Sequence, residues 1–481
     1  MGIFKSTFRK IIVGAAAAAL VACAATGGPL GLSDQQGLAL GDQEHPKIVA
    51  AFGGELNDPQ LTAYVQRIHN KLVSSSTAPS PELQNIELTV LDSPVVNAMA
   101  LPGHVYVTRG LLALANSEAE VAGVIGHEIG HIHERHTAER VSRGNLAGIG
   151  AAAVAILTGE QDMAQLAGQA AQLYLMKFSR SQEYEADLVG VRIMDQAGYD
   201  PIGQSEFLDT LGKWSSLESR IAGVERPPEF LNTHPNTPER VRRAAAEAQV
   251  LGAGSGEGRN RDTYLANIDG LLYGDDPVKQ GFIRGRDFIH PGIGIAFTVP
   301  SGFELQNSST AVIARSSQTG AQMQFTGANS AESPQAIING PLSESLGVNL
   351  GQAQAMTVSG RPGAVGTARA NTQSGAVDIA AYVVKWQGNT NYIFLWVAPA
   401  GSSSQSTFTA SVRSLRTISL QAANPPPAQR VDVVTVQRND TAASLARYMA
   451  FDQYKEERFR IMNAIEPNEA VRAGERVKLV R

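Results

Sequence analysis

The sequence contains almost no cysteine: Cys23 is the single one among 481 residues. A disulfide within the chain is therefore excluded, and stability must come from the burial of apolar side chains. Hydrophobic residues make up 43% of the chain and charged residues 18%, a composition typical of globular proteins with substantial cores. The length of 481 residues predicts about two to four domains.

The sequence also lacks a strong net charge and any apolar run long enough to span a membrane. Its formal charge of −5 gives no reason to expect nucleic acid as a partner. The apolar stretches at 11–22 and 145–159 are both shorter than the roughly 20 residues that a transmembrane helix needs. Long internal repeats are absent as well, which argues against tetratricopeptide arrays.

The first 22 residues have the pattern of an export signal. Three basic residues and no acidic residue occur in the first ten positions, and an apolar run leads from there to Cys23. Leu20-Val21-Ala22-Cys23 resembles the bacterial lipobox, in which the cysteine becomes the lipidated N-terminus of the mature protein. We therefore expect a lipoprotein signal peptide at 1–22 and a lipid on Cys23 that anchors the chain to a membrane. An ordinary signal peptide with an incidental cysteine is the alternative.

Changes in residue periodicity and composition along the chain predict a multidomain α+β protein. Helical periodicity dominates 46–250, where two strands are expected within 86–112, and short β-branched runs separated by Gly, Ser and Pro dominate 286–420. The expected segments after the signal are a tether at 23–45, a mostly helical domain with a small sheet at 46–250, a linker and helical bridge at 251–285, an α+β domain at 286–420, a Pro-rich linker at 421–430 and a small module at 431–481.

A buried helix is predicted to begin after Ser117. Ser117 is suited to be the N-cap, and Glu120, at the third helical position, completes the pattern of a capping box. The residues that follow, up to position 126, are mostly small and apolar. This helix therefore places whatever comes next in a buried environment.

Four of the nine histidines follow within ten positions. His127-Glu128-Ile129-Gly130-His131 puts two imidazoles on one helical face, four residues apart, where both can reach one metal ion. Glu128, beside the first of these histidines, could hold and deprotonate a metal-bound water. His133 and His136 are expected to lie away from the ligand face, so a third ligand must come from elsewhere.

A second predicted helix, within 176–194, carries the carboxylates of Glu183, Glu185 and Asp187. Catalytic zinc takes three protein ligands and leaves a fourth position to water, and two histidines with one glutamate are such a set. The spacing alone does not choose between Glu183 and Glu185. Asp187 could accept a hydrogen bond from a ligand histidine. A solvated charged face is the alternative for this segment.

These segments together resemble the M48 gluzincin peptidases of the Ste24, Oma1 and HtpX type. The resemblance covers about residues 46–250 and is carried by His127-Glu128-x-x-His131 with the downstream run Ser179-Arg180-Ser-Gln-Glu183-Tyr-Glu-Ala186-Asp187-x-x-Gly190. It implies one Zn2+ per chain, with Glu183 as the third ligand after His127 and His131, and with Asp187 supporting the ligands from behind.

Two further stretches carry the same resemblance. Asn97-Ala98-Met-Ala-Leu101-Pro102-Gly103 resembles the family's strand before the catalytic helix, and an extended substrate could add itself to such a sheet edge. Thr233-His234-Pro235 with Arg240 resembles the family's T-H-P-x-x-x-x-R segment. This implies that His234 lies near the site, as a transition-state stabiliser or a regulatory extra ligand. His234 or Arg240 could hold a developing oxyanion.

Residues 431–481 resemble a LysM domain with the order strand, helix, helix, strand. Asn439-Asp440-Thr441 stands where Gly-Asp-Thr is usual, and Asn463 ends the second helix. LysM modules bind N-acetylglucosamine glycans such as peptidoglycan, so glycan binding and a purely structural addition are the two expectations. The domain at 286–420 has no catalytic signature, and we expect an interaction or regulatory role for it.

The sequence thus predicts a zinc-dependent endopeptidase of the bacterial cell envelope, periplasmic and lipid-anchored to the outer membrane. Its substrates would be misfolded or stalled envelope proteins, hydrolysed by metal-activated water with Glu128 as the general base. The alternative is a peptidoglycan-binding scaffold or chaperone-like protein with an inactive peptidase domain. The intact set of His127, Glu128, His131 and Glu183 favours the enzyme. A lytic cell-wall peptidase is a third hypothesis.

Overall fold

The computed structural model of the chain describes residues 32–137, 139, 178–222, 230, 234, 238–308, 311–372, 375–402 and 405–481. The predictions for the signal peptide, for Cys23 and for the first part of the tether lie outside these residues.

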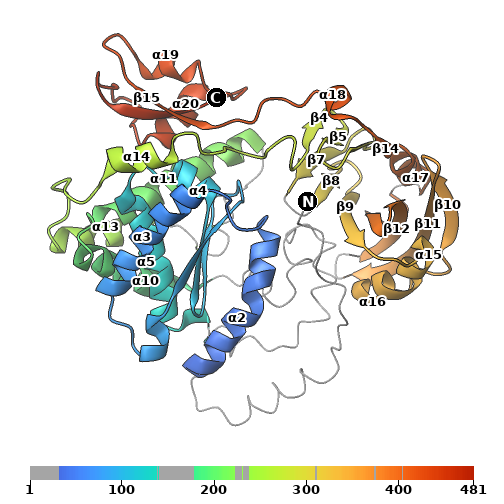
Figure 1. The fold of residues 1–481 in the computed structure, drawn as a ribbon, viewed down its shortest axis with the longest axis horizontal. Coiled ribbons are helices and arrows are strands. Elements are labelled where there is room, and N and C mark those ends of the chain that lie inside the picture. The colour runs from blue at the N-terminus through green and yellow to red at the C-terminus, as the bar shows by residue number, and fades with distance from the viewer. Residues whose placement is uncertain are drawn as a thin grey trace. The chain divides into compact units, whose positions relative to one another are not determined.

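The described chain contains both helices and strands in two compact units (Figure 1). Asp275–Pro427 form the smaller unit, and the rest of the described chain, including Ala428–Arg481, forms the larger unit. The borders expected from the sequence for the tether, the linkers and the individual domains stay predictions. None of the described helices has the length and apolarity needed to cross a membrane.

The larger unit is mostly helical and contains a small sheet. As far as residue 274 its elements are α2 (Asp34–Ala51), α3 (Pro59–Ser75), η1 (Pro81–Gln84), β1 (Glu87–Leu91), β2 (Ala98–Leu101), β3 (His104–Thr108), α4 (Arg109–Leu114), α5 (Glu118–His133), α10 (Arg180–Gln196), α11 (Ile202–Ala222), α13 (Pro238–Val250) and α14 (Arg261–Ile268).

The sheet of the larger unit has the strand order β1-β3-β2. β1 runs parallel to β3, whereas β2 pairs with β3 in the antiparallel direction. The prediction of two strands in this stretch was one too few, because a tight turn at Pro102 and Gly103 divides β2 from β3. Gly103 has a φ of +83°, which residues with a Cβ rarely adopt. β2 remains at the edge of the sheet in the described part of the chain.

Helix α5 begins after Ser117, whose hydroxyl accepts a hydrogen bond of 3.2 Å from the backbone N–H of Glu120. The Glu120 side chain does not complete the expected capping box. Its carboxylate reaches one residue further back and accepts a hydrogen bond of 2.9 Å from the backbone N–H of Asn116. The start of α5 is therefore fixed from two sides.

Glycines allow helices α5 and α10 to lie backbone against backbone. A Cβ at Gly130 would lie 2.8 Å from the backbone oxygen of Ala186, and a Cβ at Gly190 would lie 2.8 Å from the backbone nitrogen of His127. Both distances are shorter than a carbon atom tolerates. The two helices that carry the predicted metal ligands can approach this closely because these positions have no side chain.

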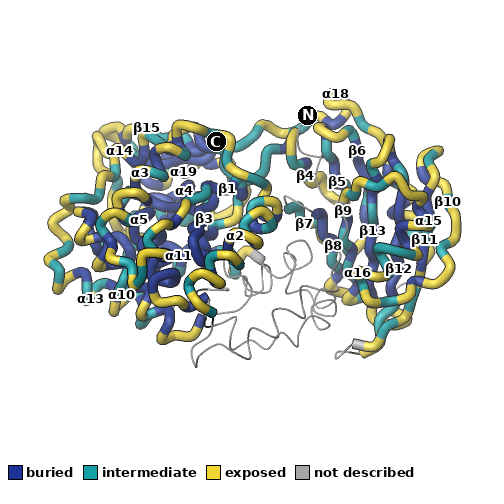
Figure 2. Tube along the Cα trace, turned by 60° about the horizontal axis from the view of Figure 1, so that its bottom comes forward, coloured by how far each residue is buried: buried dark blue, intermediate teal, exposed yellow. Residues whose placement is uncertain are grey.

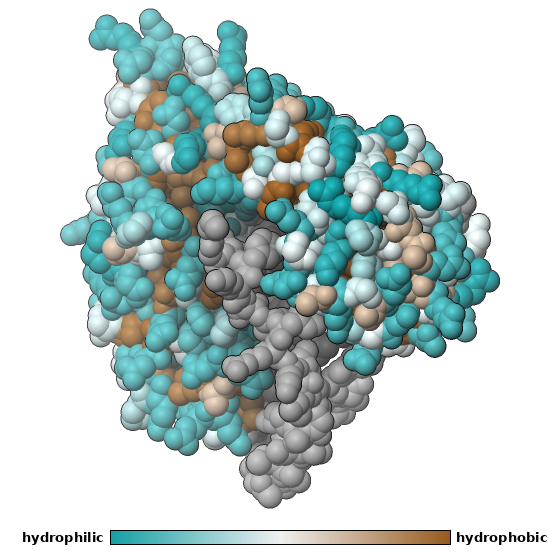
Figure 3. Space-filling view, turned by 45° about the vertical axis from the view of Figure 1, so that its right-hand side comes forward, coloured by the Kyte–Doolittle hydropathy of each residue, from teal (hydrophilic) through white to brown (hydrophobic). Residues whose placement is uncertain are grey.

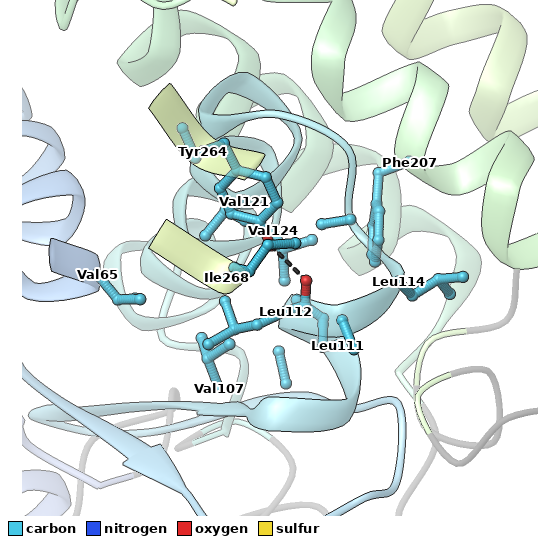
Figure 4. Close-up of a cluster of buried hydrophobic side chains, with 14 of the residues drawn as sticks. Val65, Val107, Leu111, Leu112, Leu114, Val121, Val124, Phe207, Tyr264 and Ile268 are labelled. Carbon is cyan, nitrogen blue, oxygen red and sulfur yellow. Dashed lines mark hydrogen bonds between the residues drawn. The ribbon is translucent and has the colours of Figure 1, made fainter. Parts of the chain in front are cut away.

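A continuous hydrophobic core joins the sheet to the surrounding helices. Figure 4 shows part of it, where Val107 of β3, Leu112 of α4 and Val121 of α5 are drawn with their apolar neighbours. The hydroxyl group of Tyr264, on α14, donates a hydrogen bond to the backbone oxygen of Leu112. Burial of this cluster stabilises the corner between α4 and α5.

Residues 428–481 share this core. They form β15 (Val431–Thr435), α19 (Ala442–Ala446), α20 (Lys455–Met462) and β16 (Arg476–Val480), and the two strands pair in the antiparallel direction. The buried side chains of Val431, Phe459 and Leu479 belong to the same apolar cluster as Leu112. The order of elements is the one expected for this module, and its likeness to a LysM domain stays a prediction.

The smaller unit is built on antiparallel strands. A seven-stranded sheet has the order β10-β11-β12-β13-β9-β8-β7, and a four-stranded sheet has the order β14-β6-β5-β4. The elements are β4 (Phe282–Arg284), β5 (Asp287–His290), β6 (Ile295–Thr298), β7 (Glu304–Asn307), β8 (Val312–Arg315), β9 (Gln322–Asn329), α15 (Pro334–Ile337), η4 (Ile338–Leu342), α16 (Ser343–Leu346), β10 (Gln354–Val358), β11 (Arg361–Thr372), β12 (Gly375–Gln387), β13 (Thr390–Pro399), α17 (Gln405–Arg413), β14 (Arg416–Thr417) and α18 (Leu420–Ala423).

The centre of the larger sheet in this unit is buried. Figure 2 shows long buried stretches along β12 and β13, and Trp396 and Phe394 of β13 are both fully buried. On the face shown in Figure 3, the described surface is mostly hydrophilic, with apolar patches between the hydrophilic side chains. Among the described residues, the cluster able to hold a metal ion lies in the larger unit. The role of the 286–420 domain stays a prediction.

Candidate metal centre

Side chains from distant parts of the sequence meet at one buried point of the larger unit. His127 and His131 come from α5, Glu183 comes from the first turn of α10, and His234 lies just before α13. One possible ligand atom from each of the four lies within 4.8 Å of the other three. All four side chains are at most 3% exposed, so the cluster is shielded from solvent.

The distances within the cluster suit a single ion. The Nε2 atoms of His127 and His131 lie 3.0 Å apart, and Nε2 of His131 lies 3.5 Å from Oε1 of Glu183. His234 is equally close, with its Nδ1 atom 3.2 Å from Nε2 of His127 and 3.1 Å from Oε1 of Glu183. The chain thus brings together three imidazoles and one carboxylate, one donor more than the three protein ligands that the sequence predicted.

The structure separates the two glutamates between which the spacing could not choose. Glu183 lies in the cluster, while Glu185 lies outside it with a side chain that is 57% exposed. Oε2 of Glu185 instead lies 3.1 Å from Nε2 of His136. The geometry therefore favours Glu183 as the ligand and gives Glu185 a supporting place.

His127 is oriented by Asp187. Its Nδ1 atom lies 2.9 Å from Oδ1 of Asp187, and because a carboxylate only accepts, Nδ1 must carry the proton. Nε2 is then left as an electron-pair donor that faces the cluster. Asp187 therefore occupies the place that the sequence predicted for it, behind a ligand histidine.

His136 supports the second histidine in a way that the sequence analysis missed. Nδ1 of His136 lies 2.9 Å from Nδ1 of His131, so the pair Glu185–His136 orients His131 as Asp187 orients His127. In a continuous helix His136 would lie away from the ligand face. The helix ends at His133 instead, and Arg135, with a φ of +55°, turns the chain back. No Gly, Asn or Pro stands between His131 and His136, so the sequence carries no signal for this helix end.

Arg240 has a place different from the one expected for an oxyanion donor. Its guanidinium group is buried, donates hydrogen bonds of 2.7 and 2.8 Å to the two oxygens of Asp187, and forms an ion pair with Glu183. Burial alone would raise the pKa of Glu183, but the charges of Arg240 and His234 hold it well below its ordinary value. Arg240 thus keeps two buried carboxylates ionised.

Glu128 lies beside the cluster on α5 and is fully buried. Its Oε1 atom lies 3.6 Å from Nε2 of His234, on the opposite side of that ring from the atom that faces the ligands. Two aromatic rings close the surroundings: Phe178 stacks on His131 at 3.7 Å between ring centroids, and Phe230 stacks on His234 at 4.5 Å. No motif in the sequence pointed to either ring.

Asn97 and Ala98 lie at the start of the edge strand. The backbone N–H of Asn97 donates to the hydroxyl of Thr108, and Ala98 pairs with Val107 of β3. β2 packs against α5, the helix that carries His127 and His131. The strand is thus fixed from the β3 side and lies next to the metal-ligand helix.

The donor set fits a divalent metal ion such as zinc. Imidazole nitrogens with one carboxylate are a common zinc set, and the Nδ1 atom of each α5 histidine has a polar atom 2.9 Å away. Burial lowers the pKa of His131 well below its ordinary value, which keeps the ring neutral and able to bind a metal ion. The residues present therefore match what a metal ion would require.

Comparison with known proteins points to one family. Residues 59–248 match the family described as Peptidase family M48. The chain is 29% identical to the beta-barrel assembly-enhancing protease of Yersinia pestis over 230 residues, which cover 46% of this chain and 45% of that protein. It is 35% identical to the mitochondrial metalloendopeptidase OMA1 of Arabidopsis thaliana over 182 residues, or 37% of this chain and 35% of the relative. The matches thus span less than half the length of these relatives.

Proposed function

Residues 59–248 are a domain of peptidase family M48, and from this premise we propose that the protein is a zinc-dependent endopeptidase. The observation that carries the proposal is the convergence of His127, His131 and Glu183 with Glu128 beside them. A chain that had lost the activity would have little reason to keep these polar groups together in a dry interior, where each is costly.

Each residue of the site has a place in peptide hydrolysis. His127, His131 and Glu183 would hold zinc, which when bound polarises a carbonyl and lowers the pKa of water. Glu128 takes a proton from the attacking water and passes it to the leaving nitrogen. Asp187, the Glu185–His136 pair and Arg240 hold the ligands in orientation and keep the carboxylates ionised.

The place of His234 supports the extra-ligand alternative over the oxyanion one. Its Nδ1 atom is as close to the other donors as they are to one another. A fourth protein donor would fill the position that water needs, so proteolysis would require His234 to withdraw. The stack of its ring on Phe230 also holds His234 in place.

The edge strand supplies a way to bind the substrate. An extended polypeptide can add itself to β2 through main-chain hydrogen bonds, which are independent of sequence. Such binding suits unfolded or stalled chains rather than folded ones. Because the Yersinia pestis relative is named for enhancing β-barrel assembly, we propose that the substrates are envelope proteins that have failed to assemble. The proposed place of action is the periplasm, with the lipid on Cys23 holding the protein at the outer membrane.

Glu128→Gln tests the proposal. The amide keeps the shape of the carboxylate but cannot accept the proton, so we expect one zinc per chain by elemental analysis and casein cleavage reduced about 100-fold or more. His133→Gln, on the same helix but outside the cluster, is the matched control and should keep both zinc and cleavage. Full proteolysis by the zinc-loaded Glu128→Gln protein would refute the assigned base. Wild-type protein that holds zinc but cleaves nothing would favour the scaffold alternative.

A further inference from the structure

Strand β16 carries a lysine into the interior of the larger unit. Lys478 is fully buried, although lysine is among the residues least often found inside proteins. Its ammonium group donates hydrogen bonds to the backbone oxygens of Ala113, Leu114 and Ala115, at 3.1, 2.8 and 2.5 Å. These three carbonyls form the C-terminal end of α4, where the helix dipole favours a positive charge.

The corner that Lys478 binds leads directly into the metal-ligand helix. Only Ala115, Asn116 and Ser117 separate α4 from α5, and the Glu120 carboxylate accepts a hydrogen bond from the backbone N–H of Asn116. Arg261 also ties this corner to β16, since its guanidinium group donates to the backbone oxygens of Asn116 and Arg476. The first turn of α5 is thus held by residues that lie more than 140 positions further along the chain.

The position of Lys478 within its own module is equally fixed. The side-chain oxygen of Asn463 accepts a 2.7 Å hydrogen bond from the backbone N–H of Lys478, and the Asn463 amide donates one of 2.9 Å to the backbone oxygen of Lys478. Both backbone groups of the strand residue are therefore satisfied by one side chain from the end of α20. The module presents Lys478 to α4 as a rigid group.

We propose that residues 428–481 act as an internal brace for the metal-ligand helix, and that Lys478 is the positioning residue through which the brace acts. The proposal rests on the proposed metallopeptidase function. Glu120 lies seven residues, about two helical turns, before His127. A helix transmits a shift at its first turn along its axis, so the position of Glu120 sets the position of both histidines. Removal of the ammonium would leave three buried carbonyls without their donor.

Lys478→Met tests this brace, because methionine keeps much of the length and loses the charge. The matched control is Lys455→Met in the same module, where the ammonium contacts Arg447 rather than the α4 corner. We expect Lys478→Met to weaken Zn2+ binding at least tenfold in a chelator competition and to change the visible spectrum of the Co2+-substituted protein. The control should match the wild type in both. A folded Lys478→Met protein with unchanged Zn2+ affinity and Co2+ spectrum would overturn the proposal.

If Lys478→Met does not fold, hydrogen exchange on the metal-free wild-type chain tests whether α5 depends on the brace. We expect the amides of β16 and of the first two turns of α5 to open together, with the same free energy. Much faster exchange in β16 than in α5 would show that the helix does not depend on the brace. Neither the metal-binding measurement nor hydrogen exchange depends on proteolysis. A wild-type protein without proteolytic activity would therefore contradict the proposed function but would not affect the test of the brace.

Discussion

Glu120 is a carboxyl group buried under the first turn of α5, with an exposed fraction of 2%. Burial raises its pKa to about 7, against the opposing charge of Lys478 and the hydrogen bond from Asn116. A carboxyl group whose pKa is higher in the folded than in the unfolded chain stabilises the fold most when it is protonated. The contribution is complete below the unfolded pKa of 4.5 and is lost as the pH rises to about 7.

Glu120→Gln should therefore remove one pH dependence of stability. The amide is neutral at every pH, so the free energy of unfolding of the variant minus that of the wild type should increase between pH 4.5 and about 7 and level off above. Urea unfolding of the metal-free proteins at four pH values measures it. Glu82→Gln, at an exposed position, is the matched substitution. A difference that stays constant over this range would contradict the assignment.

The candidate ligand residues could be found from the sequence because their spacing is local. His127 and His131 are four residues apart, and Glu183 and Asp187 repeat that spacing on the second helix. Contacts that depend on how the chain turns, or on how distant segments pack, could not be predicted from the sequence. His136 needed the reversal at Arg135, and the contacts of Arg240 needed the packing of α13 against α10. Neither leaves a periodic trace in the sequence.

At the scale of elements, the contact between α5 and α10 sets the geometry of the metal centre. A Cβ at Gly190 would lie 2.8 Å from the backbone nitrogen of His127, and backbone atoms cannot move aside as a flexible side chain could. Gly190 belongs to the family pattern at 179–190, but the pattern alone carries no physical reason for a glycine there. The reason is that one ligand helix crosses the other at the ligand itself.

Gly190→Ala should force the two ligand helices apart. We expect a loss of about 1–3 kcal/mol in the free energy of unfolding together with weaker Zn2+ binding. Gly37→Ala on α2 is the matched control, since its new Cβ would meet Pro102 at an ordinary contact distance of 3.6 Å. That variant should be at least as stable as the wild type, because alanine is the better helix former. Equal stability and Zn2+ affinity in Gly190→Ala and Gly37→Ala would show that the close crossing is not required.

At the scale of the whole molecule, the C-terminal module could not be placed from the sequence. Strand–helix–helix–strand order can be read from local patterns, but nothing local tells that β16 docks on a corner 363 to 365 residues earlier. The Pro-rich stretch before it even suggested an independent module. Because the module shares the core of the larger unit, binding to peptidoglycan is better tested with the intact chain than with one cut at residue 430.

The expected lipid anchor is a second property of the whole chain, and one that the described residues do not touch. Cys23→Ser removes the only thiol, so we expect the protein to move from the membrane fraction to the soluble fraction of the envelope. Immunoblots of the two fractions after cell lysis measure the change. Ser6→Ala, in the same expected signal, is the control and should stay with the membrane. Unchanged membrane association of the Cys23→Ser protein would refute lipidation.

The separation of Lys478 from α4 along the chain has a consequence for biosynthesis. Ribosomes make His127 and His131 some 350 residues before the strand that carries Lys478. Contacts of such long range form late. In a nascent chain the candidate ligands would leave the ribosome long before β16 exists to position them. If the proposals hold, the chain could not become an active protease until almost all of it had been translated.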